Sequence, residues 1–195
     1  MSTFLATHKL GIRFGISALV LAVWTMDLGR ASAQGFTPGR YGIGTPAEAE
    51  LIAALDVDVR ADGHGLPAGT GNYEAGAVLF SQLCVDCHGE NLLGGRERGG
   101  ALIGGRGTLT SEYPRRTVES YWPYATILFD YIRRAMPYPS PGGLEPSQVY
   151  SVIAYVLGKA NIIEKSMVIG ADNLAAIEMP NRDGFRSDWQ PEMFR

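Results

Sequence analysis

The sequence predicts an all-α domain with irregular arms on both sides of it. Apolar side chains recur at helical spacing in three stretches, near residues 72–84, 125–136 and 146–158. The 195 residues include 25 Gly and 11 Pro, so loops should take a large share of the chain. A composition of 46% hydrophobic and 19% charged residues excludes a collagen-like repeat, a polytopic membrane protein and a wholly disordered chain. The net charge of −3 does not provide the positive surface potential that attracts a nucleic acid.

The first 33 residues have the pattern of a cleaved secretory signal. His8, Lys9 and Arg13 form a basic start, and residues 16–26 form an apolar run. This run is shorter than the roughly 20 residues that span a bilayer core. Small residues follow at Ala31-Ser32-Ala33, so we expect cleavage near Ala33, a periplasmic mature chain and no membrane span after cleavage. An uncleaved anchor or a buried helix is the alternative.

Two cysteines followed by a histidine form the most specific motif of the chain. The run Cys84-Val85-Asp86-Cys87-His88 contains both cysteines of the sequence. Its spacing is that of a c-type haem attachment site, where two thiols add to the vinyl groups of one porphyrin edge and the histidine reaches the iron. Three other interpretations stay open: a thioredoxin-like redox pair, a plain disulfide, and a structural zinc site that His64 would have to join.

A helix leads into this motif. Asn72 is a candidate N-cap, and Glu74 lies near the positive end of the helix. Gly76 costs about 1 kcal/mol relative to Ala inside a helix, which indicates a close crossing with another helix; an incidental glycine is the alternative. One face of this helix carries both thiols toward the interior, and it consists of Gly76, Phe80, Leu83, Cys84 and Cys87.

A second helix is predicted near the end of the domain. Pro146 suits its first turn, and termination signals lie at residues 158–161. Its apolar positions are Val149, Val152, Ile153, Val156 and Leu157.

The iron needs a sixth ligand, and Met136 is the best-placed methionine. Pro137 stops a helix directly after it. The alternatives are a core methionine at a helix end, Met179 and His64. A His–Met pair fills both axial positions and favours electron transfer over chemistry at the iron, so we expect no enzyme activity from the chain alone. The apolar face that ends at this methionine consists of Ala125, Leu128, Phe129, Ile132 and Met136.

These features resemble the class I cytochrome c family. In that family a glycine and an aromatic residue of the first helix cross an aromatic stripe in the last helix, and Gly76, Phe80 and Tyr155 match these positions. The resemblance implies a class I cytochrome c fold around one covalent haem c. The expected organisation is a signal peptide at 1–33, an irregular N-terminal arm at 34–71, a cytochrome c domain at 72–165 and a C-terminal arm at 166–195.

Three stretches are similar to the cytochrome subunit of periplasmic molybdenum sulfite and sulfane dehydrogenases. The resemblance implies that Met136 is the axial ligand, that a molybdenum-cofactor subunit donates electrons, and that a downstream cytochrome or oxidase accepts them. This chain has one haem motif, whereas some sulfane dehydrogenase subunits have two, so sulfite or sulfane stays open as the partner's substrate. The first stretch consists of Gly44-Thr45-Pro46-Ala47, Asp56-Val57-Asp58-Val59-Arg60, Asp62-Gly63 and Gly65-Leu66-Pro67-Ala68-Gly69. The second is the run SYWPYATILFDYIRRAMP at 120–137, and the third is Met179-Pro180-Asn181-Arg182-Asp183-Gly184-Phe185.

Other functions and contacts stay open at this point. A free diffusible carrier between respiratory complexes is one alternative, and a haem enzyme or gas sensor with an open axial site is another. Arg115, Arg116 and Trp122 are candidate contacts of the haem propionates, since guanidinium and indole groups donate to carboxylates; a solvated basic pair and a core tryptophan are the alternative. The two arms are either disordered or wrapped around a partner.

Overall fold

The computed structural model describes residues 44–96 and 99–186. The chain divides into two compact units, residues 1–46 and 47–195. Of the first unit only residues 44–46 are described, as an exposed stretch without helix or strand, and the predicted signal peptide lies outside the described residues. The elements of the second unit are α2 (Ala49–Leu55), β1 (Thr70–Gly71), α3 (Tyr73–Leu83), α4 (Val85–His88), α5 (Ala125–Ala135), α6 (Pro146–Lys159), β2 (Ile169–Gly170) and the 3₁₀ turn η1 (Leu174–Ala176).

Local capping sets where α3 and α6 begin. The Asn72 side chain accepts a hydrogen bond from the Ala75 N–H at 2.9 Å, so the predicted N-cap of α3 is confirmed. Helix α6 starts with Pro146, and the Gln148 side chain accepts from the Glu145 N–H at 2.9 Å. After Lys159 the chain turns through Asn161, whose φ of 51° is left-handed.

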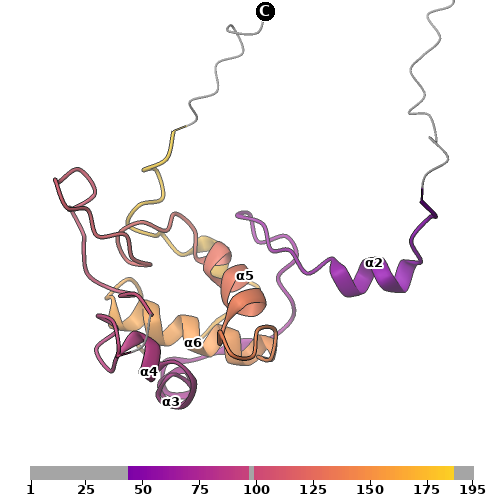
Figure 1. The fold of residues 1–195 in the computed structure, drawn as a ribbon, viewed down its shortest axis with the longest axis horizontal. Helices are drawn as coiled ribbons and strands as arrows, with labels where there is room; N and C mark the ends of the chain where they lie inside the picture. The colour runs from indigo at the N-terminus through magenta and orange to yellow at the C-terminus, as the bar shows by residue number, and fades with distance from the viewer. Residues whose placement is uncertain (1–43, 97–98, 187–195) are drawn as a thin grey trace, which may run out of the picture. The chain divides into compact units, whose positions relative to one another are not determined.

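Helices α3 and α6 cross in direct backbone contact. Figure 1 shows α3 nearly end-on beside α6, whose axis runs across the view. A Cβ atom on Gly76 would overlap the carbonyl oxygen of Ser151 and would lie 2.8 Å from the Tyr155 Cβ. Gly71, just before α3, meets the backbone of the same Ser151. The close crossing predicted from Gly76 is therefore confirmed.

Aromatic rings fill the space beside this crossing. The Tyr155 ring lies 5.1 Å from the ring of Phe80 and 5.1 Å from that of Tyr73, in tilted geometry. Phe80 is buried, and Tyr155 is half-buried. The pairing of Gly76 and Phe80 with Tyr155, which the family resemblance implied, is thus present.

Helix α5 packs its predicted apolar face against α6 (Figure 1). Leu128, Phe129 and Ile132 are buried, and the Phe129 ring lies 4.6 Å from that of Tyr150. The Tyr150 hydroxyl donates to the Pro67 carbonyl at 2.9 Å, which ties the chain before β1 to α6. Burial of this phenol raises the pKa of Tyr150 to about 12.

None of the helices in the described ranges is long and apolar enough to cross a membrane.

The described part of the predicted C-terminal arm, residues 166–186, packs onto the chain's own core. Strand β2 pairs antiparallel with β1, so that Ile169 lies opposite Gly71. Four apolar residues of this segment are buried, so the core extends well past the end of α6. They are Ile169, Leu174, Ile177 and Met179.

Helix α2 lies in the segment where the sequence predicts an irregular arm. It has only seven residues, AELIAAL, with no buried side chain. Six of these seven residues are apolar, so the run has no alternation of apolar and polar faces, and its Ala, Leu and Glu residues favour a helix by local propensity.

We expect Gly76→Ala to destabilise the fold. The new methyl group gains about 1 kcal/mol of helix propensity, but it must push α3 away from the Ser151 backbone, and overpacking of this kind costs about 1–3 kcal/mol or more. Guanidinium unfolding of the haem-loaded protein should show a net loss. Gln82→Ala, an exposed change on the same helix, is the control and should leave stability within about 0.5 kcal/mol.

We also expect a chain that stops after Lys165 to lose most of its stability. The deletion removes Ile169 and Leu174, both 0% exposed, and each large core side chain contributes about 2–5 kcal/mol. A chain that stops after Arg186 keeps these residues and is the matched control. Equal thermal midpoints for the two truncated chains would show that residues 166–186 do not contribute to the core.

Candidate functional site

The two cysteines and His88 lie in one tight turn at the end of α3. Cys84 caps α3 and immediately begins α4, the single turn Val85–His88. The Cys84 N–H still donates to the Phe80 carbonyl at 3.0 Å, and the His88 N–H donates to the Cys84 carbonyl at 2.9 Å. The α3–α6 crossing therefore determines the position of the whole motif.

The His88 ring has a defined orientation and a free nitrogen. Its Nδ1 lies 2.8 Å from the Gly100 carbonyl oxygen. A carbonyl only accepts, so Nδ1 carries the proton and donates it. In the neutral ring Nε2 then has the free lone pair, which is the atom that binds a metal.

A glycine-rich segment wraps closely around this turn. The Gly95 N–H donates to the Cys87 carbonyl at 2.9 Å, and the Gly94 N–H donates to the His88 carbonyl at 3.0 Å. A Cβ on Gly99 would lie 2.5 Å from the Cys87 carbonyl carbon, so only glycine fits. This close approach places Gly100 where its carbonyl reaches His88.

Cys84 and Cys87 are free, half-buried thiols. Burial, with a smaller contribution from Cys87, raises the pKa of the Cys84 thiol to about 11. Before haem is attached, this thiol is therefore mainly protonated at neutral pH.

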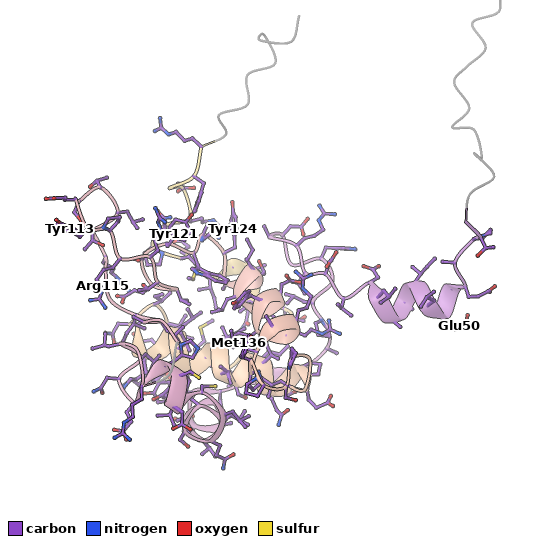
Figure 2. All side chains as sticks on the ribbon, viewed as in Figure 1. Glu50, Tyr113, Arg115, Tyr121, Tyr124 and Met136 are labelled. Carbon is purple, nitrogen blue, oxygen red and sulfur yellow. The ribbon has the colours of Figure 1, made fainter. Side chains whose placement is uncertain are left out.

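Met136 lies at the C-terminal end of α5, as the sequence predicts. Its N–H donates to the Ile132 carbonyl at 3.0 Å, but its own backbone is extended, so Met136 is the C-cap of α5 and Pro137 follows where the helix has ended. Figure 2 shows Met136 in the middle of the helical body, whereas Arg115 lies at its edge. The alternative ligand Met179 is buried in the core at 3% exposure, and His64 is an exposed loop residue.

Several apolar residues of the motif turn, of the loop after it and of the segment around α5 are only half-buried. They pack against the buried core and keep part of their surface exposed. Two thiols, an adjacent imidazole and exposed apolar surface beside them fit a haem, whose flat apolar faces would cover such surface. The half-buried residues include Cys84, Val85, Leu102, Ile103, Trp122 and Met136. Within residues 44–96 and 99–186, no three His, Cys, Asp or Glu side chains are grouped to hold a metal ion.

The candidate propionate contacts are mostly at the surface. Arg115 and Arg116 are exposed, and the Arg116 guanidinium lies 5.8 Å from the centre of the Tyr121 ring. The Arg115 backbone is held by Ser120, whose hydroxyl donates to its carbonyl at 2.5 Å. Trp122 is half-buried and stacks edge-on against Tyr131 at 5.5 Å.

An ion pair not predicted from the sequence fixes the loop after the motif. Glu119, whose side chain is 13% exposed, pairs with Arg106 at 2.6 Å and accepts from the Gly104 N–H. Arg106 in turn donates to the Ala160 carbonyl at the end of α6, at 2.7 Å. These contacts join residues 13 to 54 positions apart in the sequence, so no local sequence pattern predicts them.

Comparisons with known proteins agree with this geometry. The model of the cytochrome c family matches residues 73–159, which run from the first residue of α3 to the last of α6. No curated protein matches the chain. Among solved structures, the crystal structure of the sulfane dehydrogenase SoxCD from Paracoccus pantotrophus is similar, with a TM-score of 0.72 and 34% sequence identity over 80% of this chain and 78% of that chain. The chain therefore belongs to the cytochrome c family, with a helical class I fold, an electron-transfer role and haem c as its cofactor.

Proposed function

We propose that this chain is the haem-bearing electron-transfer subunit of a periplasmic molybdenum sulfite or sulfane dehydrogenase. The observation that carries the proposal is the 34% identity to a chain of a sulfane dehydrogenase over four-fifths of the sequence. In this proposal the molybdenum subunit oxidises the sulfur compound and the present chain passes the electrons on to a downstream cytochrome or oxidase. Without that partner the chain catalyses nothing.

Each residue of the motif has a separate task. Cys84 and Cys87 would hold one covalent haem by thioether bonds, and His88 would bind the iron through Nε2, because its Nδ1 is engaged by Gly100. Met136, at the end of α5, would supply the second protein ligand. Haem c, when bound in this way, carries one electron at a time and offers no open iron site.

The surroundings of the motif exclude water and balance charge. The half-buried apolar residues would cover a bound haem, and an apolar shell of this kind limits the access of water and tunes the reduction potential. Arg115, Arg116 and Trp122 remain our candidates for the propionates. Their exposed or half-buried positions suit carboxylates that lie near the surface.

Helix α2 favours a bound subunit over a free diffusible carrier. Leu51 and Ile52 are each 53% exposed and Leu55 is 70% exposed, all on a helix with no buried residue. Leaving these side chains in water is unfavourable, at about 25 cal/mol per Å² of apolar surface. A partner subunit that covers this helix removes the cost.

The ligand assignment is tested by Met136→Ala. We expect the ferric protein to lose its sulfur-to-iron charge-transfer absorption, the reduction potential to fall, and carbon monoxide to bind the reduced form, because one axial position opens. Met179→Ala is the matched control and should keep the absorption band. A band that survives in Met136→Ala contradicts the assignment, and carbon monoxide binding to the reduced wild type supports the sensor alternative.

The partner is tested by purification from the native host. We expect molybdenum to co-elute with the chain, and sulfite or thiosulfate to reduce the haem in that complex. Leu51→Ser with Leu55→Ser should keep the haem spectrum and lose the molybdenum, because these changes remove the apolar surface of α2 without touching the core. A wild-type chain that elutes without molybdenum, and is reduced by neither compound, is a free carrier.

A further inference from the structure

A polar stripe on α5 holds a second chain segment beside this helix. Thr126, Asp130 and Arg134 are spaced by four residues and therefore lie on one side of α5. The segment beside them is residues 57–61, which has no helix or strand of its own. At the first residue of the stripe, the Thr126 hydroxyl donates to the Ala61 carbonyl at 3.1 Å.

Asp130 is the centre of these contacts. One of its carboxylate oxygens accepts from the Val59 N–H at 3.0 Å, and the other pairs with Arg134 one turn further along the helix. Arg134 also pairs with Asp58 at 3.3 Å. The Asp130 side chain is 13% exposed and Val59 is 6% exposed, so solvent screens the Asp130–Val59 contact only in part. One carboxylate thus links the backbone of residues 57–61 to the last turn of α5.

That last turn ends at Met136. The Met136 N–H donates to the Ile132 carbonyl at 3.0 Å, so the nitrogen of this extended C-cap residue is tied to the last turn. A rotation or slide of α5 therefore moves the point from which the Met136 side chain leaves the helix. The apolar face of α5 packs on α6. Apolar contacts tolerate a small slide of the helix, whereas a charged hydrogen bond requires a fixed geometry.

We propose that Asp130 is a positioning residue for the Met136 thioether, acting by anchoring the last turn of α5 to residues 57–61. The inference rests on the proposed function, because it takes Met136 as the axial ligand. Asp130 acts through the helix and not by contact with the thioether or the haem. It holds the helix so that the sulfur stays at the iron.

The test is the rate at which cyanide displaces the thioether in the ferric, haem-loaded full-length protein. Cyanide binds only when the sulfur has left, so the rate reports local opening at Met136. We expect cyanide to displace the thioether about tenfold faster in Asp130→Ala than in the wild type. The rate is measured as the decay of the sulfur-to-iron absorption band at one cyanide concentration. Asp130→Asn keeps the oxygen that accepts from the Val59 N–H and should give an intermediate rate. If the alanine variant does not accumulate in cells, the rate measured on Asp130→Asn tests the inference in its place.

Two controls separate positioning from general destabilisation. Asp62→Ala removes a mostly exposed partner of Arg60 near the same segment and should leave the rate within twofold of wild type. Val152→Ala thins the core of α6, lowers global stability and should also leave the rate within twofold. An unchanged rate in both Asp130 variants, or an equal acceleration in Val152→Ala, overturns the inference. If the band survives in Met136→Ala, the ligand assignment and the inference fall together.

Discussion

The backbone contact between α3 and α6 at Gly76 is the constraint on which the rest of the structure depends. The two helices approach so closely that Ser151 leaves no room for a Cβ atom on Gly76. Cys84 caps α3 and starts the next turn, so fixing α3 also fixes both thiols and His88. A helix crossing made of ordinary side chains would hold the two axes further apart and would move the motif with them.

Loops complete the environment of the motif where helices do not reach. Glycines after the motif allow the backbone to pass against Cys87 and to offer the Gly100 carbonyl to His88. Further along, the Glu119–Arg106 pair fastens the loop to the end of α6. The long irregular segments are therefore built from specific contacts, and these contacts leave a half-covered apolar surface that a haem fits.

Membership of the cytochrome c family and the similarity to a sulfane dehydrogenase chain establish an electron-transfer role for this fold. The features outside the common core bear on the proposed partner. Residues 166–186 are part of the chain's own core, which leaves the exposed helix α2 as the described element best suited to contact another subunit. Segment 57–61, which follows α2 in the chain, is anchored to α5 through Asp130.

The sequence by itself determined the local features: the Cys84–His88 motif, the N-cap at Asn72, the start of α6 at Pro146 and the end of α5 before Pro137. These follow from spacing, capping and proline geometry, which act within a few residues. Only the tertiary structure decided the Gly100 contact to His88, the Glu119–Arg106 pair, the anchoring of residues 57–61 and the burial of Ile169 and Leu174. Such contacts join residues that are distant in the chain, and their free energy depends on burial and geometry that exist only after the helices have packed.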